Sequence, residues 1–205
     1  WVAYCLLPTS AFSQGTEKFG QNRVQYKDFT FSYYESDNFI TYYYLGGQDI
    51  AKYVIKAAED NSDDISNVLD YRYKRKIDII VYNNINELNQ TNIGIYDPEQ
   101  SPGGTIRVPE NKLFVYFNGD HANLDMQIRF GIAKMYIDQL ARGLTFGEKI
   151  QNAVLLNLPE WYKTGLAKYI AAPWNSDDED RLRDGILSGR FEKLNKLPQE
   201  EQIFV

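Results

Sequence analysis

The feature that most constrains the fold is a short, almost uninterrupted apolar run in the first half of the chain. Residues 76–82 read Lys-Ile-Asp-Ile-Ile-Val-Tyr, in which β-branched aliphatic residues predominate. Runs of this kind are typical of strands that lie inside a sheet. We therefore predict a buried strand over residues 76–82, and the patterns on either side of it indicate what kind of sheet it joins.

Two strands and a long helix are predicted before this run. Residues 24–34 and 38–45 are rich in Tyr, Phe, Thr and Ile, and Glu35-Ser36-Asp37 between them is a turn signal. From residue 48 to residue 69 the apolar positions recur at helical spacing, which predicts one long helix. The polar pair Asn61-Ser62 is a point at which this helix could be interrupted.

The segments after the buried strand predict a hairpin and then helices. Residues 85–90 indicate a short helix, the Gly- and Pro-rich residues 92–104 a loop, and residues 105–108 and 112–118 a pair of strands. Helices are predicted over residues 120–141 with Asp120 as N-cap, 145–156, 158–172 and onward from a cap at Ser176, before an irregular end at 194–205. Strands first and helices late indicate an α+β fold, a small mixed sheet followed by a mostly helical half.

Length and charge restrict the function. A chain of 205 residues is long enough for one domain with a full core. Its formal net charge of -6 and isoelectric point of about 4.9 argue against nucleic acid as a partner, because phosphates attract basic surfaces. The short basic run of Arg72, Lys74, Arg75 and Lys76 is interpreted as a solvated helix end that complements the helix dipole.

The first residues have the pattern of an export signal. The apolar residues 1–7 are followed by Ala11 and Ser13, which are small residues at the -3 and -1 positions of a signal-peptidase site before Gln14. Residues 1–13 are therefore predicted to be a signal-peptide remnant, with an apolar N-terminal strand or helix as the alternative. Cys5 is the single cysteine, so no intrachain disulfide can form. No other segment has the roughly 20 apolar residues of a membrane span.

One motif lies in the last third of the chain. It reads Leu158-Pro159-Glu160-Trp161-Tyr162-Lys163-Thr164-Gly165-Leu166-Ala167-Lys168-Tyr169. It resembles the Pro-x-Trp-x-x-Glu-Gly-x-Ala motif of gluzincin metallopeptidases, which implies a zincin-like fold. In that family a preceding helix carries His-Glu-x-x-His, so that two histidines on one helix face share a zinc ion and the glutamate deprotonates bound water. The glutamate of the Trp motif is the third zinc ligand.

At the positions that this resemblance assigns to zinc chemistry, the chain has other residues. Arg129 and Ala133 replace the two histidines, Phe130 replaces the general base, and Thr164 replaces the glutamate ligand. Arginine cannot be deprotonated in a protein and so makes no metal ligand, and Phe and Ala have no donor atom. The resemblance therefore implies a protein that has no catalytic residues, metal or cofactor and is not an enzyme.

A closer resemblance covers nearly the whole chain after residue 13. The matching stretches are Phe19-Gly20-Gln21-Asn22-Arg23-Val24-Gln25-Tyr26, Ile79-Ile80-Val81-Tyr82, Phe114-Val115-Tyr116-Phe117-Asn118-Gly119-Asp120-His121 and the Trp motif. They resemble the peptidase-MA-like domain of exported Bacteroidota proteins that carry a TolB-like β-propeller. There the degenerate helix usually reads Arg-Glu-Gly-Ile-Ala, from which Phe130 departs. The resemblance implies one such domain over residues 14–195, residues 196–205 as the start of a linker or propeller, and a periplasmic or outer-membrane-associated location.

Plainer interpretations stay open beside these. The Leu-Pro-x-Trp segment can be an ordinary helix start, with Pro159 at the first helical position and Trp161 packed in the core. His121, the only histidine, is interpreted as a surface or capping residue. Acidic residues 177–180 lack the spacing of a calcium loop and suit the first turn of a helix.

Unrelated chemistry has weaker support. Glu110, Glu148 and Glu160 could belong to a glycosidase pair, but nothing in the sequence places two of them at the separation that this chemistry requires. A nucleophile elbow, a phosphate loop and a dinucleotide fingerprint are all absent from the sequence.

Three functions follow, in order of preference. The first is a non-catalytic binding or assembly module of an exported cell-envelope protein, in a cleft lined by Trp161, Tyr162 and Tyr136. There Arg129 would bind a carboxylate on a peptide or cell-wall fragment. The second is a purely structural domain that packs on its own propeller or on an envelope partner, with the cleft filled by side chains such as Phe130. The third is an active hydrolase with a non-standard site.

Overall fold

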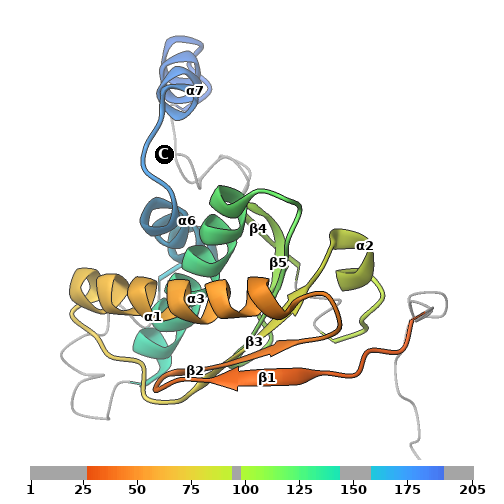
Figure 1. Ribbon diagram of the computed structural model, residues 1–205. Helices are drawn as coiled ribbons and strands as arrows, with labels where there is room; N and C mark the ends of the chain where they lie inside the picture. Colours follow the sequence, from red (N-terminus) through yellow and green to blue (C-terminus); the bar gives the residue numbers. More distant parts are fainter. Residues whose placement is uncertain (1–26, 94–97, 144–157, 192–205) are drawn as a thin grey trace, which may run out of the picture.

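The computed structural model describes residues 27–93, 98–143 and 158–191. They form an α+β fold in which one mixed sheet packs against helices (Figure 1). The strands are β1 (Ser32–Glu35), β2 (Phe39–Tyr43), β3 (Ile77–Tyr82), β4 (Pro98–Ser101), β5 (Gly104–Arg107) and β6 (Lys112–Tyr116). Their order across the sheet is β1-β2-β3-β6-β5-β4. The predicted fold class is confirmed, while its zincin-like assignment stays a prediction.

The apolar run forms β3, an interior strand of the sheet. β3 pairs in parallel with β2 on one side and with β6 on the other, whereas the outer pairs β1–β2, β5–β6 and β4–β5 are antiparallel. Successive side chains of a strand point to opposite faces. Ile77, Ile79 and Val81 accordingly join the main core, and Ile80 and Tyr82 join a smaller core on the other face. Both faces of β3 are buried, as its composition predicts.

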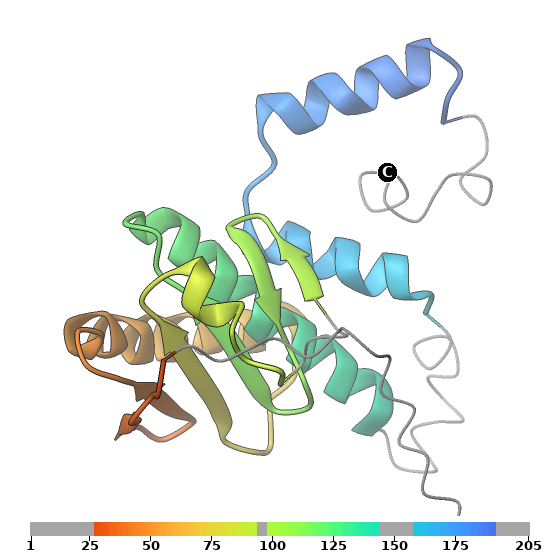
Figure 2. The ribbon, with the colours of Figure 1, turned by 90° about the vertical axis from the view of Figure 1, so that its right-hand side faces the viewer.

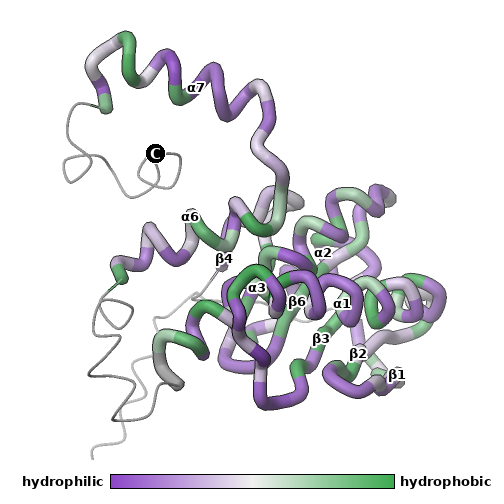
Figure 3. Tube along the Cα trace, turned by 90° about the vertical axis from the view of Figure 1, so that its left-hand side faces the viewer, coloured by the Kyte–Doolittle hydropathy of each residue, from purple (hydrophilic) through white to green (hydrophobic). Residues whose placement is uncertain are grey.

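Helices cover the sheet on both faces, but unequally. Residues of α1 (Gln48–Leu69), α3 (His121–Gly143) and α6 (Glu160–Ala171) share the main core with β3 and β6. The single-turn α2 (Ile85–Leu88) belongs to the smaller core. Helix α7 (Ser176–Leu187) projects away from this body (Figure 2). Hydrophobic positions are dense along β3 and α3, whereas α7 is mostly hydrophilic (Figure 3).

Helix α1 runs without a break through the polar pair that could have interrupted it. Ser62 is buried, and its hydroxyl oxygen lies 2.6 Å from the Tyr136 hydroxyl oxygen on α3. The pair therefore marks a hydrogen-bonded contact between two helices. None of the helices within the described ranges is long and apolar enough to cross a membrane.

The prediction of a loop over residues 92–104 is wrong at its C-terminal end, where β4 forms. The Pro-Glu-Gln-Ser sequence of β4 has no apolar alternation, so its pairing with β5 could not be read from a pattern. The hairpin is held from outside by Gln127 of α3, whose Nε2 donates to the carbonyl oxygens of Gly103 and Tyr116, both at 3.1 Å. A Cβ atom at Gly103 would collide with the backbone of Asn123. Contacts with α3 thus position this edge of the sheet.

Three predicted segments lie outside the described residues. They are the signal-peptide remnant over residues 1–13, the helix over residues 145–156, which includes Glu148, and the irregular end from residue 194, which includes the linker over 196–205.

Candidate functional site

Arg129 of α3 joins three helices through its guanidinium group. Its Nε donates to the carbonyl oxygen of Ile170 on α6 at 2.7 Å. Its Nη1 donates to Asn61 Oδ1 at 2.8 Å and to Asp64 Oδ2 at 3.2 Å, both on α1. The last carbonyl groups of a helix have no partner within the helix, and a cation there also complements the helix dipole. Arg129 therefore caps the C-terminal end of α6.

The other residues at the zincin positions are mostly used for packing. Phe130 and Ala133 are fully buried in the main core, and Thr164 is partly buried on α6. Tyr136, expected in the cleft, is also buried, with its ring stacked at 5.2 Å on that of Tyr73. Phenyl and methyl side chains in a dry core have no donor atom to offer a metal or a substrate. Phe130, Ala133 and Tyr136 thus belong to the hydrophobic core.

The first turn of α6 brings the two remaining cleft candidates together. Trp161 is partly buried and Tyr162 is exposed, and their rings meet edge to face with centroids 5.8 Å apart. Pro159 is the N-cap of α6, one residue before the first helical position. Neither ring is among the residues that line the pocket described below.

Sequence reasoning missed a buried lysine between α3, α6 and β4. Lys134 is almost fully buried, and its Nζ lies 2.5 Å from Glu160 Oε1 and 3.2 Å from Glu99 Oε1. Lys163 Nζ extends the network, at 2.5 Å from Glu160 Oε2 and 3.3 Å from Asp138 Oδ1. The available signal was a single lysine inside the apolar stretch Ile132-Ala133-Lys134-Met135-Tyr136. A buried lysine needs a carboxylate partner.

The network shifts the pKa values of its members in different directions. Burial opposes the charge of Lys134, but its hydrogen bond to Glu160 and the nearby carboxylates outweigh burial and raise its pKa. Burial likewise opposes the charge of Glu160, but hydrogen bonds from Lys134 and Lys163 prevail and lower its pKa. Burial dominates at Glu99 and raises its pKa despite Lys134. Lys134 is therefore a fixed internal cation next to the position of Ala133.

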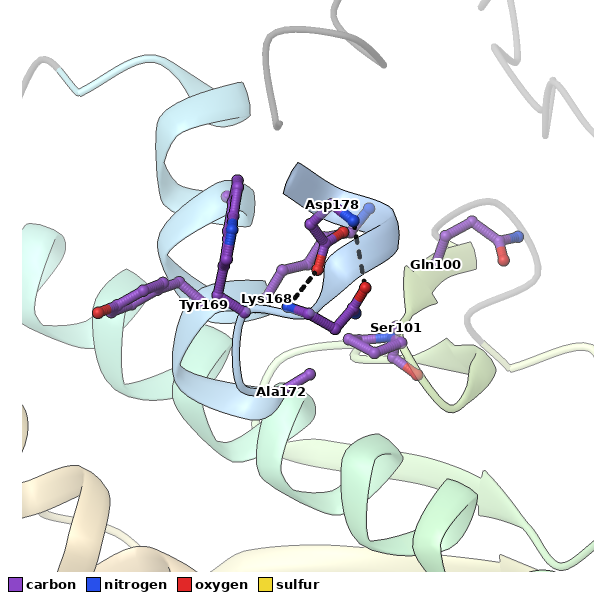
Figure 4. Close-up of a pocket in the computed structure, with 10 residues that line it drawn as sticks. Gln100, Ser101, Lys168, Tyr169, Ala172 and Asp178 are labelled. Carbon is purple, nitrogen blue, oxygen red and sulfur yellow. Dashed lines mark hydrogen bonds between the residues drawn. The ribbon is translucent and has the colours of Figure 1, made fainter. Parts of the chain in front are cut away.

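A pocket of about 310 Å³ opens where the β4–β5 turn meets α6 and α7. Gln100, Ser101 and Pro102 form one wall, and Lys168 and Tyr169 project from α6 (Figure 4). The chain between the two helices adds Trp174, and the first turn of α7 adds Asp178. This volume lies at the lower end of the range for small-molecule pockets. The pocket is thus built partly by the Trp-motif helix, but by residues other than those predicted.

Lys168 supplies the cationic group of the pocket. Burial lowers its pKa, as does the charge of Arg181, while the negative charges of Glu99 and Asp178 act in the opposite direction. Charged side chains of β4 and α7 therefore act on an ammonium group that α6 provides.

A capping box fixes the wall that α7 contributes. Asn175 Oδ1 accepts from the backbone nitrogens of Asp177 at 2.8 Å and Asp178 at 3.1 Å, and Asp178 Oδ2 accepts from the backbone nitrogen of Asn175 at 3.3 Å. The two bonds between Asn175 and Asp178 are drawn in Figure 4. The N-cap is Asn175 and not Ser176 as predicted, because the amide side chain reaches both orphan N–H groups.

The acidic run belongs to a helix start, and the histidine packs against aromatic rings. Asp177, Asp178 and Glu179 occupy the first turn of α7, where the helix dipole favours negative charge. His121 is exposed, and its ring packs edge to face against Tyr53 at 4.7 Å and Phe117 at 4.9 Å. Within residues 27–93, 98–143 and 158–191, no group of three or more His, Cys, Asp or Glu side chains is arranged to hold a metal ion.

The remaining glutamate candidate is also accounted for by local structure. Glu110 lies in the β5–β6 turn with a φ of 56°, the left-handed conformation that such a turn requires.

Comparisons with protein-family models, with curated proteins and with solved structures found no match to this chain.

Proposed function

We propose that this chain is a non-catalytic binding module of an exported cell-envelope protein, and that it holds an anionic ligand in the pocket between the β4–β5 turn, α6 and α7. The observation that carries the proposal is the pocket itself, which has the lysine Lys168 in its wall. The ligand carboxylate is assigned to Lys168 and not to Arg129, because Arg129 already donates to acceptors on two other helices. The export assignment rests on the family resemblance of the sequence.

We propose a non-catalytic role because of the residues at the zincin positions. The positions that would carry a zinc site hold Arg129, Phe130, Ala133 and Thr164. Of these, Phe130 and Ala133 are enclosed in the main core, and neither has a donor atom. Hydrolysis in this region would therefore need another set of groups, and the Lys134 network has its carboxylates committed to lysines.

A purely structural domain is the second candidate. It is favoured by the complete burial of Phe130, which fills the space beside α3 with an apolar ring. In that case the pocket at Lys168 would bind no small ligand, and α7 would serve only as a contact to a neighbouring domain.

The test is an NMR titration of backbone amides with three carboxylate probes. These are acetate, the blocked peptide Ac-Ala-Glu-Ala-NH2 and D-glucuronate, with Ac-Ala-Gln-Ala-NH2 as the neutral match. At least one anionic probe is expected to shift the backbone amides of Gln100, Ser101 and the non-proline residues of 165–178, and Lys168→Gln is expected to abolish those shifts. Mass spectrometry of the recovered peptide is expected to find it intact.

Two outcomes decide against the proposal. If none of the three anionic probes shifts the pocket amides, the structural alternative takes its place. If the peptide is cleaved in proportion to time and protein concentration, the module is a hydrolase after all. Lys52→Gln serves as the matched control, because Lys52 lies on α1, is largely exposed and forms an ion pair with the exposed Asp49 at 3.6 Å.

A further inference from the structure

We infer that a second pocket, on the face of the sheet opposite the main core, binds a free aromatic α-amino acid. This pocket has a volume of about 410 Å³ and shares no lining residue with the pocket at Lys168. The inference therefore goes beyond the proposed function and does not depend on it. It rests on a wall of aromatic rings and on one charge of each sign at the end of the pocket floor.

The floor of this pocket comes from three neighbouring strands. Tyr42 of β2 lies opposite Ile80 of β3, and Ile80 lies opposite Phe114 of β6. All three side chains line the pocket, because residues that pair directly across strands point to the same face of a sheet. Ile80 and Phe114 also belong to the smaller core, so packing holds the floor in place. The sheet therefore forms this site before any ligand arrives.

Aromatic rings surround the remaining space. The Phe31 ring meets the Tyr82 ring at 85° with centroids 6.4 Å apart, and the Tyr82 ring stacks on that of Phe114 with centroids 6.5 Å apart. Phe31 is 40% exposed and Ile93 is 55% exposed, although both line the pocket. Burial of this apolar area against a ligand is favourable. Aromatic rings prefer offset or edge-to-face contact with a further ring, so the wall favours an aromatic side chain over an aliphatic one.

An ion pair lies at one end of the floor. Asp78 of β3 lies directly opposite Lys112 of β6, two residues along the strands from Ile80 and Phe114. Both charged side chains line the pocket and are partly exposed, and Lys112 Nζ lies 3.3 Å from Asp78 Oδ2. An ammonium group has three N–H donors and a carboxylate has two oxygens, so this one bond uses only part of the capacity of each group.

A ligand with both charges complements this pair. A ligand with a single charge is attracted to one member of the pair and repelled by the other. A zwitterion can place its ammonium group beside Asp78 and its carboxylate beside Lys112, so that both contacts are charge-assisted. An α-amino acid carries the two groups on one carbon, which keeps them as close together as this cross-strand pair.

The spacing along the strands suits an aromatic side chain. Two residues of strand place the ion pair about 7 Å from the row of Ile80 and Phe114. A single methylene group and a ring, as in phenylalanine, can cover this span. The pocket volume of about 410 Å³ also lies within the range of small-molecule sites. Charge and shape thus point to the same class of ligand.

The test is isothermal titration calorimetry with L-phenylalanine and three analogues that each lack one feature. 2-Phenylethylamine lacks the carboxylate, 3-phenylpropionate lacks the ammonium group, and L-alanine lacks the ring. L-Phenylalanine is expected to bind about tenfold or more tightly than either single-charge analogue, the effect of one charge-assisted hydrogen bond. It is also expected to bind at least about tenfold more tightly than L-alanine, which leaves the aromatic wall in water.

Substitutions assign each part of the site. Asp78→Asn should weaken L-phenylalanine and 2-phenylethylamine by about tenfold and spare 3-phenylpropionate, whereas Lys112→Gln should weaken L-phenylalanine and 3-phenylpropionate and spare the amine. Phe31→Ala, at an exposed position, should weaken all three aromatic probes by about three- to tenfold. The matched controls are Lys76→Gln, from an exposed ion pair, and Tyr33→Ala, from an exposed ring on β1. Neither side chain lines the pocket, so neither control should change binding.

Three results would overturn the inference. Equal affinity for L-phenylalanine and its single-charge analogues, or unchanged L-phenylalanine binding in both Asp78→Asn and Lys112→Gln, rules out an amino acid held by the ion pair. Equal affinity for L-alanine and L-phenylalanine rules out the aromatic wall as the selective element. If none of the four compounds binds, the site itself is rejected. The carboxylate titration at Lys168 reports on different residues, so its result stands or falls separately.

Discussion

At the scale of single residues, Arg129 shows how a position that resembles a catalytic one can become structural. The guanidinium group has a fixed fork of donors, and here those donors reach a carbonyl at the end of α6 and two polar side chains on α1. Each contact joins helices that are far apart in the sequence. These contacts indicate that Arg129 stabilises the packing of α3 against α1 and α6.

Replacing Arg129 should consequently destabilise the protein. Arg129→Ala removes the cap of α6 and the bond to Asn61, and we expect a loss of about 2 kcal/mol in the free energy of unfolding. Arg183→Ala is the control, because Arg183 is exposed and its ion pairs among the described residues lie within α7, and it should cost less than about 0.5 kcal/mol. Urea denaturation monitored by circular dichroism measures both. Equal effects of the two substitutions would contradict the structural role of Arg129.

The Lys134 network should give the protein two pH dependences of opposite sign. The folded pKa of Glu160 lies below its ordinary value of 4.5, so its contribution to stability is present above pH 4.5 and is lost as pH falls through the folded pKa. The folded pKa of Glu99 lies above 4.5, so its contribution is present below pH 4.5 and is lost as pH rises through the folded pKa.

Two variants separate these contributions. Glu160→Gln should flatten the loss of stability below pH 4.5, and Glu99→Gln should remove the loss just above that pH. Thermal denaturation at half-unit intervals of pH follows both. Parallel stability curves for the wild type and both variants would show that neither carboxylate changes its protonation equilibrium on folding.

At the scale of elements, the sequence predicts best where periodicity is strong and local. The apolar run of β3 and the helical spacing of α1 are confirmed, because burial selects those side chains directly. β4 could not be predicted, since its pairing depends on backbone contacts and on Gln127 from a distant helix. The pocket was missed for the same reason. Lys168, Tyr169 and Trp174 line a pocket only because the fold places the β4–β5 turn beside α6, and no local sequence pattern predicts that contact.

The start of α7 allows a direct comparison between sequence and structure. Asn175→Ala should destabilise α7 by about 1 kcal/mol, because both orphan N–H groups lose their acceptor. Ser176→Ala, at the cap that the sequence predicts, should have almost no effect. Amide hydrogen exchange at Asp177 and Asp178 measures the difference. Faster exchange in Ser176→Ala than in Asn175→Ala would restore the original cap assignment.

At the scale of the whole molecule, the question is whether the helix layer can hold a metal at all. After dialysis against zinc, elemental mass spectrometry is expected to find much less than one zinc per chain. The reason is that Arg129 stays protonated and that Phe130 and Ala133 have no donor atoms. One zinc per chain would mean that the zincin positions are misplaced, and loss of that zinc in His121→Ala would identify the histidine as a ligand.

The parallel centre of the sheet also determines how the chain folds. β3 pairs with β2, which precedes it by the whole length of α1, and with β6, which follows it after the β4–β5 hairpin. Neither pairing is local, so loop-closure entropy must be overcome before the central hydrogen bonds form. We therefore expect slow folding, on the order of milliseconds to seconds. A chain that emerges from the ribosome or a translocation channel cannot complete this sheet until residues 112–116 are free, and until then β3 has an exposed, aggregation-prone edge.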